Sequence, residues 1–299
     1  MPEAAARQPD APPLRRRPRL AVVIGSGGLK CVAGVGMWKI LQREGIHPDL
    51  VVGCSGGSLY TAGMALGMDA REAEHRSHRM WDGLFQRVHY ASVLRSLLPR
   101  RWGFNERVGL VNDRAVGEAL KELYGDASFA DTKVPLLIAA TDLHSGERVR
   151  LASGRLVDAV RASIAMPLLL RPWPIDGRLL IDGGVSDPLP ISLAIREGAD
   201  IILAMGFETP PMERMDSLRG VVRHSIATTV NHLLRSTYAF YSAVHHAEIV
   251  PIMPEFEKPV GVSDTHLIPY IIEQGERATL QVLPYLRQLK LTEASVEGA

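Results

Sequence analysis

Ser55 is the side chain whose surroundings most favour chemistry, because it stands in a Gly-x-Ser-x-Gly pattern, Gly53-Cys54-Ser55-Gly56-Gly57. The apolar run 50–52 before it predicts a strand, and the residues after it predict a helix. A serine in such a sharp turn needs small neighbours and presents its hydroxyl. The amino end of the helix favours an oxyanion there. Since the pattern also arises by chance in a glycine-rich chain, this context is what indicates a nucleophile.

A second candidate is the glycine-rich turn Gly25-Ser26-Gly27-Gly28-Leu29-Lys30, directly after the apolar run 20–24. The turn lacks the Gly-Lys-Ser/Thr of a P-loop, and Lys30 stands where the dinucleotide fingerprint needs glycine. Two consecutive glycines, Gly27 and Gly28, can turn their N–H groups toward a substrate oxygen, as an oxyanion hole requires. A tight turn with a structural role only is the alternative.

A nucleophilic serine needs a base, and a Ser-His-Asp triad would take it from the ten histidines. His266, near a predicted helix start, is the best candidate in Ser-Asp-His order, although an ordinary solvated or buried histidine is the simpler interpretation. In an α/β-hydrolase several strands precede the serine turn, whereas here only the run 20–24 does so clearly. The other histidines fall in predicted helices or offer no better position, among them His75, His78, His245 and His246.

Asp182 is the better candidate for the base. It ends the apolar run 179–181 and is followed by Gly183 and Gly184, a position at which parallel sheets assemble their sites. A carboxylate with the ordinary pKa of ~3.9 is a weak base, but burial and direct contact with the serine hydroxyl would strengthen it. A plain hairpin turn is the other interpretation of Asp-Gly-Gly.

The elements that would position these residues alternate along the chain, which predicts a three-layer α/β/α sandwich with a mostly parallel central sheet. We expect a disordered arm over residues 1–19, one domain over 20–290 and a tail over 291–299. Strands are predicted at 20–24, 50–52, 135–140, 148–151, 178–181 and 200–205. Helices are predicted through Met37, Ile40 and Leu41 up to Gly45, after Ser58, over most of 69–125, and around 215–246 and 265–290. A short apolar stretch at 249–253 lies between the last two.

The composition of the chain argues against several classes of function. The chain has 299 residues, 46% hydrophobic, which is ample for a core, and its net charge of +1 gives no case for a nucleic-acid partner. The basic cluster 15–19 predicts a solvated tail or, alternatively, attraction to anionic lipid. Cys31 and Cys54 form neither a disulfide framework nor a Cys-x-x-Cys metal pattern. We therefore expect an intracellular, cytoplasmic protein that uses no metal or organic cofactor.

The segment 84–104 interleaves aromatic and aliphatic residues with arginines, as a lid or membrane-facing element would. A helix packed on the core with solvated arginines is the alternative interpretation.

Together, the turn at 25–30, the early Gly-x-Ser-x-Gly and the late Asp-Gly-Gly resemble the patatin-like phospholipase family. The likeness spans most of residues 20–205. It also includes three further runs: Ala140-Thr141-Asp142-Leu143 with Ser145-Gly146-Glu147, Arg161-Ala162-Ser163-Ile164-Ala165-Met166-Pro167, and Pro188-Leu189-Pro190.

This resemblance implies lipid acyl-ester hydrolysis by a Ser55–Asp182 dyad through an acyl-serine, with Gly27 and Gly28 forming the oxyanion hole. Lys30 falls where the family carries Arg or Lys, and would steady the loop or meet a lipid phosphate. Ser26 and Cys31 stand where the family usually has glycine. Both are small, so we expect the turn to be kept with less backbone freedom. An acyltransferase or thioesterase using the same dyad, or a lipid-sensing regulatory protein, stays open as an alternative.

Overall fold

The computed structural model describes residues 17–85, 109, 111, 113–211 and 218–289. Its strands are β1 (Leu20–Ile24), β2 (Leu50–Cys54), β3 (Leu136–Asp142), β4 (Arg148–Leu151), β5 (Trp173–Ile175), β6 (Arg178–Asp182), β7 (Ile201–Met205) and β8 (Glu248–Ile252). Its longer helices are α1 (Ala33–Arg43), α2 (Gly56–Leu66), α3 (Ala70–Phe85), α5 (Asp113–Tyr124), α6 (Leu156–Ser163), α7 (Ile191–Arg196), α8 (Leu218–Val244) and α9 (Ile268–Gln288). Short 3-10 turns include η1 (Gly28–Val32), η4 (Gly183–Val185) and η5 (Thr265–Leu267).

The strands of the described part form one sheet in the order β5-β6-β3-β2-β1-β7-β8, with β4 also paired to β3. Strands β3, β2, β1, β7 and β8 are parallel neighbours, whereas β4 and β6 run antiparallel to β3 and β5 runs antiparallel to β6. The central strands are apolar on both faces, as expected of parallel strands covered on both sides. The predicted, mostly parallel sheet is confirmed.

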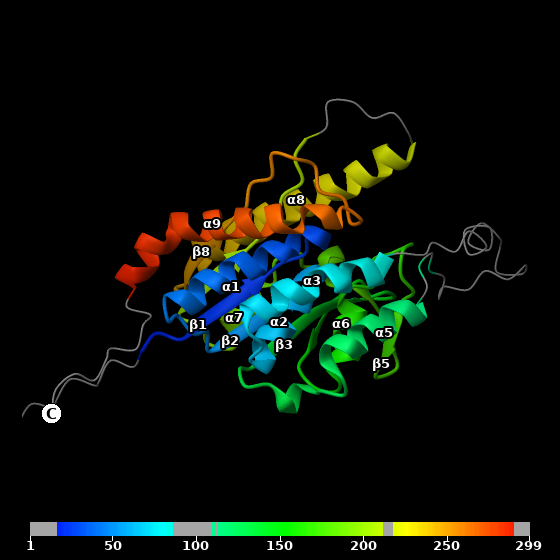
Figure 1. Cartoon of the computed structure of the whole chain (residues 1–299), viewed down its shortest axis with the longest axis horizontal. Helices are drawn as coiled ribbons and strands as arrows, with labels where there is room; N and C mark the ends of the chain where they lie inside the picture. Colours follow the sequence, from blue (N-terminus) through cyan, green and yellow to red (C-terminus); the bar gives the residue numbers. More distant parts are fainter. Residues whose placement is uncertain (1–16, 86–108, 110, 112, 212–217, 290–299) are drawn as a thin grey trace, which may run out of the picture.

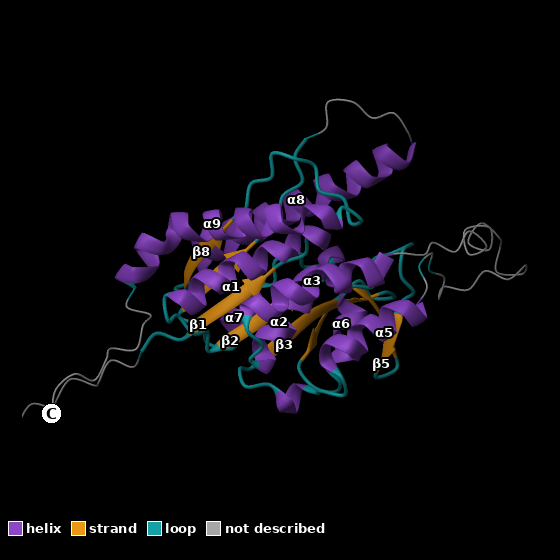
Figure 2. Ribbon diagram, in the orientation of Figure 1, coloured by secondary structure: helices purple, strands orange, loops and turns teal. Residues whose placement is uncertain are grey.

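Helices cover both faces of this sheet. Alternate strand residues such as Leu20 and Val22 pack in a core with α1, α2, α3, α5, α6 and α9. The intervening residues, such as Ala21 and Val23, pack with α7 and α8 on the opposite face. In Figure 1, α9 runs alongside α1, and Figure 2 shows the strands between helices. The three layers predicted from the sequence are therefore present.

Helices α1 and α9 are packed backbone to backbone. A Cβ atom on Gly36 would lie 2.2 Å from the carbonyl oxygen of Ile272, and one on Gly275 would lie 2.0 Å from that of Ala33. Glycine on both helices is therefore required for this close approach. This glycine-mediated packing joins α9 to α1.

Several elements depart from the sequence predictions. Strand β5, with Pro174 at its centre, and the short helices α6 and α7 were not predicted, because three to eight residues give little periodic signal. The arm was predicted to be disordered through residue 19, but Arg17 pairs with Asp49 and the N–H of Arg19 donates to Asp200 (2.7 Å). Residues 1–16 and 291–299 lie outside the described residues. The predicted lid, 84–104, falls outside them too except at its start.

Candidate active site

Ser55 occupies a strained turn between β2 and α2. Its φ of 53° lies in the left-handed region that non-glycine residues avoid, and α2 begins at the next residue, Gly56. Such a conformation costs about 1–3 kcal/mol and persists only where surrounding contacts hold it. Here the carbonyl of Ser55 accepts hydrogen bonds from the N–H (2.9 Å) and hydroxyl (2.6 Å) of Ser58. The predicted strand–turn–helix elbow is thus present.

Strand register brings Asp182 to this turn. Ala140 and Thr141 of β3 pair with β4 and also with β6, so β4 and β6 lie on opposite edges of β3. Strand β2 pairs with the residues of β3 that precede Ala140. Strands β2 and β6 therefore pair with the same edge of β3, β2 along its first half and β6 along its second half. Because β2 is parallel to β3 and β6 is antiparallel to it, the carboxyl ends of β2 and β6 face each other. Ser55 follows the end of one strand and Asp182 ends the other.

The two side chains are in direct contact. The Ser55 hydroxyl donates a hydrogen bond to Oδ2 of Asp182 (2.6 Å), and the N–H of Gly184 donates to Oδ1 (2.8 Å). Asp182 is 4% exposed, and burial raises its pKa to about 6, although these two hydrogen bonds act in the opposite direction. The carboxylate is therefore mostly ionised at neutral pH and more basic than an ordinary aspartate.

The glycine-rich turn packs against both motifs. A Cβ atom on Gly56 would lie 2.6 Å from the carbonyl oxygen of Gly28, and one on Gly184 would lie 2.4 Å from the hydroxyl of Ser26. Gly28 has a φ of 57° and begins η1, whose first N–H groups have no partner within the helix. The three motifs that are far apart in sequence thus form one cluster at the carboxyl end of the sheet.

Ser26 and Cys31, the two residues predicted to restrict the turn, are both held in it. The N–H of Ser26 donates to the carbonyl of Pro188 (2.7 Å), and the buried thiol of Cys31 donates to the carbonyl of Gly25 (3.3 Å). Burial raises the pKa of the Cys31 thiol, so it stays protonated and able to donate. The Cys31 thiol therefore adds a hydrogen bond that glycine could not make, whereas Ser26 is held through its backbone N–H, which glycine would also have.

Lys30 points to the neighbouring loop after β7. Its amine donates to the carbonyl of Glu208 (3.0 Å) and to the hydroxyl of Thr209 (3.1 Å). Burial lowers the pKa of Lys30, partly opposed by Cys31 and Glu208. These contacts fit the loop-steadying alternative for Lys30.

Ser163 is a site residue to which no role was assigned from the sequence. Its hydroxyl accepts the N–H of Ser55 (2.8 Å) and donates to the carbonyl of Ala139 (2.7 Å), and it is fully buried. It therefore links the elbow to β3 at the point where β2 ends. Its place within the run 161–167 was the available signal, but no spacing rule identifies a serine that binds backbone.

A family model, described as the patatin-like phospholipase model, matches residues 22–195, which include all of these motifs. The chain belongs to the patatin-like phospholipase family. An uncharacterized NTE family protein of Mycobacterium tuberculosis is 31% identical over 229 residues, covering 75% of this chain and 58% of the relative. The human patatin-like phospholipase domain-containing protein 6 is 29% identical over 207 residues, covering 67% of this chain and 14% of that protein. The chain thus spans between about a seventh and three fifths of the length of these relatives.

A solved structure shares the patatin fold. VipD from Legionella pneumophila superposes with a TM-score of 0.50 at 14% identity, covering 90% of this chain and 67% of that one. At this identity the likeness concerns the fold alone.

The histidine candidates for a triad lie elsewhere in this patatin-like structure. His266 is in η5 and is exposed, and His75 and His78 are on α3. In the part of the chain that the structure describes, the side chain to which the Ser55 hydroxyl is hydrogen-bonded is Asp182. The geometry therefore favours the carboxylate over an imidazole as the partner of Ser55.

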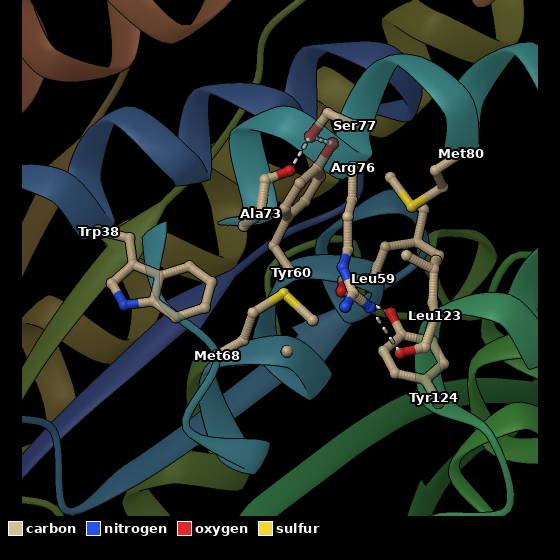
Figure 3. Close-up of a pocket in the computed structure, with 11 residues that line it drawn as sticks. Trp38, Leu59, Tyr60, Met68, Ala73, Arg76, Ser77, Met80, Leu123 and Tyr124 are labelled. Atoms are coloured by element: carbon tan, nitrogen blue, oxygen red, sulfur yellow. Dashed lines mark hydrogen bonds between the residues drawn. The ribbon is translucent and has the colours of Figure 1, made fainter. Parts of the chain in front are cut away.

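A small cavity lies beside α2 (Figure 3), lined by side chains of α1, α2, α3 and α5, among them Trp38 and Leu59, and by Met68 in the loop after α2. Its volume of about 20 Å³ leaves room for about one water molecule. Tyr60 in its wall is hydrogen-bonded to Ser77 (3.3 Å), and burial raises the pKa of Tyr60. Since neither Ser55 nor Asp182 lines it, we regard this cavity as part of the core.

The described residues contain neither a candidate metal site nor a helix that could span a membrane. No group of three or more His, Cys, Asp or Glu side chains is placed to hold a metal ion there. In the same residues, no helix combines the length and apolar character needed to cross a bilayer.

Proposed function

We propose that this protein is a lipid acyl hydrolase in which Ser55 is the nucleophile and Asp182 is the general base. One observation carries the proposal: the Ser55 hydroxyl donates a 2.6 Å hydrogen bond to a buried carboxylate whose pKa is raised to about 6. A base near neutral pKa accepts a proton from an attacking hydroxyl more readily than an ordinary carboxylate does. Membership of the patatin-like phospholipase family supports lipid esters as substrates.

The proposed reaction has two halves. Ser55 Oγ bonds to the ester carbonyl carbon while its proton passes to Asp182, and the carbonyl oxygen becomes an oxyanion that accepts N–H bonds from Gly27 and Gly28. The carbonyl re-forms, the ester bond breaks, and Asp182 returns the proton to the departing alcohol. Water then attacks the acyl-serine and gives its proton to Asp182. Collapse of this second oxyanion breaks the bond between Ser55 Oγ and the acyl carbon and releases the fatty acid, and Asp182 returns its proton to Oγ to restore the Ser55 hydroxyl.

Residues 20–290 are proposed as one catalytic domain. The family model ends at residue 195, but later residues complete the packing around the site. A Cβ atom on Gly27 would lie 2.5 Å from the Phe207 ring, and α9 packs against α1 through Gly275. The proposed oxyanion turn therefore rests on residues beyond the matched range.

The test is hydrolysis of a panel of phospholipids, acylglycerols, acyl thioesters and nitrophenyl esters by wild type and Ser55→Ala. Ser153→Ala, at an exposed serine in a turn, is the matched control. We expect Ser55→Ala alone to abolish fatty acid release while circular dichroism shows an intact fold. Wild-type-like turnover in that variant would end the assignment. Transfer of the acyl group to an added alcohol would favour an acyltransferase, preferential thioester cleavage would favour a thioesterase, and no turnover with any ester would favour a lipid-sensing protein.

A further inference from the structure

The amino-terminal half of α8 stands apart from the body of the protein. Among the described side chains of this helix, Leu234 is the first that is buried, and those between residues 220 and 233 are partly or fully exposed. Figure 1 shows this end of α8 projecting beyond the other helices. Its apolar side chains face solvent: Val221 is 43%, Val222 46% and Ile226 57% exposed. Contiguous exposed apolar residues of this kind mark an interaction surface.

This projecting half lies at the active-site edge of the sheet. Helix α8 connects the end of β7 to the start of β8, which run parallel, so it begins at the edge where the strands end. The side-chain amide of Asn231 accepts the backbone N–H of Thr209 (3.0 Å) and donates to the backbone carbonyl of Thr209 (2.7 Å). Arg235 pairs with Glu208. Lys30 of the proposed oxyanion turn binds the same two loop residues. Residues 218–230 therefore extend outward from the edge that carries Ser55.

Two further apolar side chains are exposed beside the site. Val185 follows Asp182 by three residues and is 51% exposed, and Leu168 is 69% exposed. Leu168 lies three residues beyond Ala165, whose carbonyl accepts the N–H of Asp182 (3.0 Å). Exposed apolar residues thus occur both on α8 and next to the proposed base, on one edge of the molecule.

The charge of α8 identifies the kind of partner. Residues 218–244 contain three arginines and two histidines but no aspartate, glutamate or lysine. Over 27 residues of a chain with 33 acidic residues, this absence leaves a helix without a repulsive charge for an anionic surface. Exposed apolar residues combined with basic residues match an anionic bilayer surface better than a protein partner bearing mixed charge.

We infer that residues 218–230 of α8 are a membrane-docking element, which seats the active-site edge on a bilayer carrying anionic headgroups. The apolar side chains enter the acyl boundary, and the net positive charge of the helix attracts the anionic headgroups. The inference rests on the proposed function, because a lipid substrate is what docking would deliver to Ser55.

The test measures binding apart from catalysis, by cosedimentation of the full chain with sucrose-loaded vesicles of phosphatidylcholine, with and without phosphatidylglycerol. Ile226→Ser is compared with Val244→Ser, whose side chain is equally exposed (58%) at the opposite end of α8. We expect Ile226→Ser to weaken the partition coefficient on phosphatidylglycerol vesicles about tenfold, as loss of one buried aliphatic side chain would. Val244→Ser should bind as wild type does, and salt at about 1 M should weaken wild-type binding.

The same measurement in Ser55→Ala protein keeps the two proposals separate, because binding needs no turnover. With wild-type Ser55, Ile226→Ser should keep hydrolysis of a soluble short-chain ester and lose vesicle hydrolysis. Equal binding by wild type and Ile226→Ser, or equal losses in Ile226→Ser and Val244→Ser, would overturn the inference. So would a wild-type dimer that Ile226→Ser converts to monomer with vesicle binding unchanged, since this face would then be an interface between copies of the chain.

Discussion

Replacing the proposed base by its neutral isostere, Asp182→Asn, should stabilise the protein at neutral pH while it removes activity. The carboxylate is buried, and its ionised form is held in place by the Ser55 hydroxyl and the Gly184 N–H. An asparagine oxygen can accept from Gly184, and its amide can donate to the Ser55 oxygen, which accepts as well as donates. The substitution therefore keeps the hydrogen bonds and removes the buried charge.

The magnitude follows from the pKa of Asp182, which burial raises from the ordinary 3.8 to about 6. Because the folded state holds the proton more tightly than the unfolded state, the free energy of unfolding falls as pH rises from about 4 to about 6. At 1.36 kcal/mol per pKa unit, ionised Asp182 costs up to about 3 kcal/mol above that range. Asparagine carries no such cost. In a protein of this size, 3 kcal/mol corresponds to a rise in Tm of roughly 5–10 °C.

Urea unfolding followed by circular dichroism from pH 4 to pH 8 measures this difference. Asp182→Asn should exceed wild type by up to about 3 kcal/mol at pH 7–8, and the difference should shrink toward zero near pH 4. Asp82→Asn, at an exposed position on α3, is the matched control and should show no such trend. An Asp182→Asn protein that is less stable than wild type at every pH would refute the reasoning, because the carboxylate would then be a net structural support.

Three other outcomes are expected. Ser163→Ala should lower the free energy of unfolding by about 1–3 kcal/mol and slow turnover, because the buried N–H of Ser55 loses its acceptor; unchanged urea unfolding would contradict this. His266→Ala should keep wild-type turnover of the ester panel, whereas a loss as large as that of Ser55→Ala would establish a triad. Incubation with EDTA should leave ester hydrolysis unchanged, and activity lost in EDTA and restored by one divalent ion would reveal a metal requirement.

The sequence was informative where the signal is local. Apolar runs followed by a glycine identified β1 and β7 closely, and the small residues around Ser55 identified the strained turn. These predictions need only a few consecutive residues, because a strand covered on both faces must be apolar throughout. The mostly parallel sheet followed from the alternation of these strands with helices.

The features that could not be predicted from the sequence depend on residues that are far apart in the chain. The contact between Ser55 and Asp182 depends on β6 continuing the edge of β3 beyond the end of β2, a matter of register rather than of composition. The pKa of Asp182 depends on burial by the whole cluster. The run 161–167 does not indicate that Ser163 binds the backbone of Ser55, and the projecting end of α8 carries no motif, so only the packing of the chain reveals these two features.

The rate and the site of fluorophosphonate labelling test the central claim most directly, because this probe forms a stable phosphorus–oxygen bond only with an activated serine. Wild type should carry one adduct, located by mass spectrometry of the proteolysed protein on the peptide containing Ser55. Folded Asp182→Asn should label about 10²–10⁴ times more slowly, as expected for loss of a general base. An adduct on another serine, or wild-type labelling of Ser55 in the Asp182→Asn protein, would contradict the Ser55–Asp182 dyad.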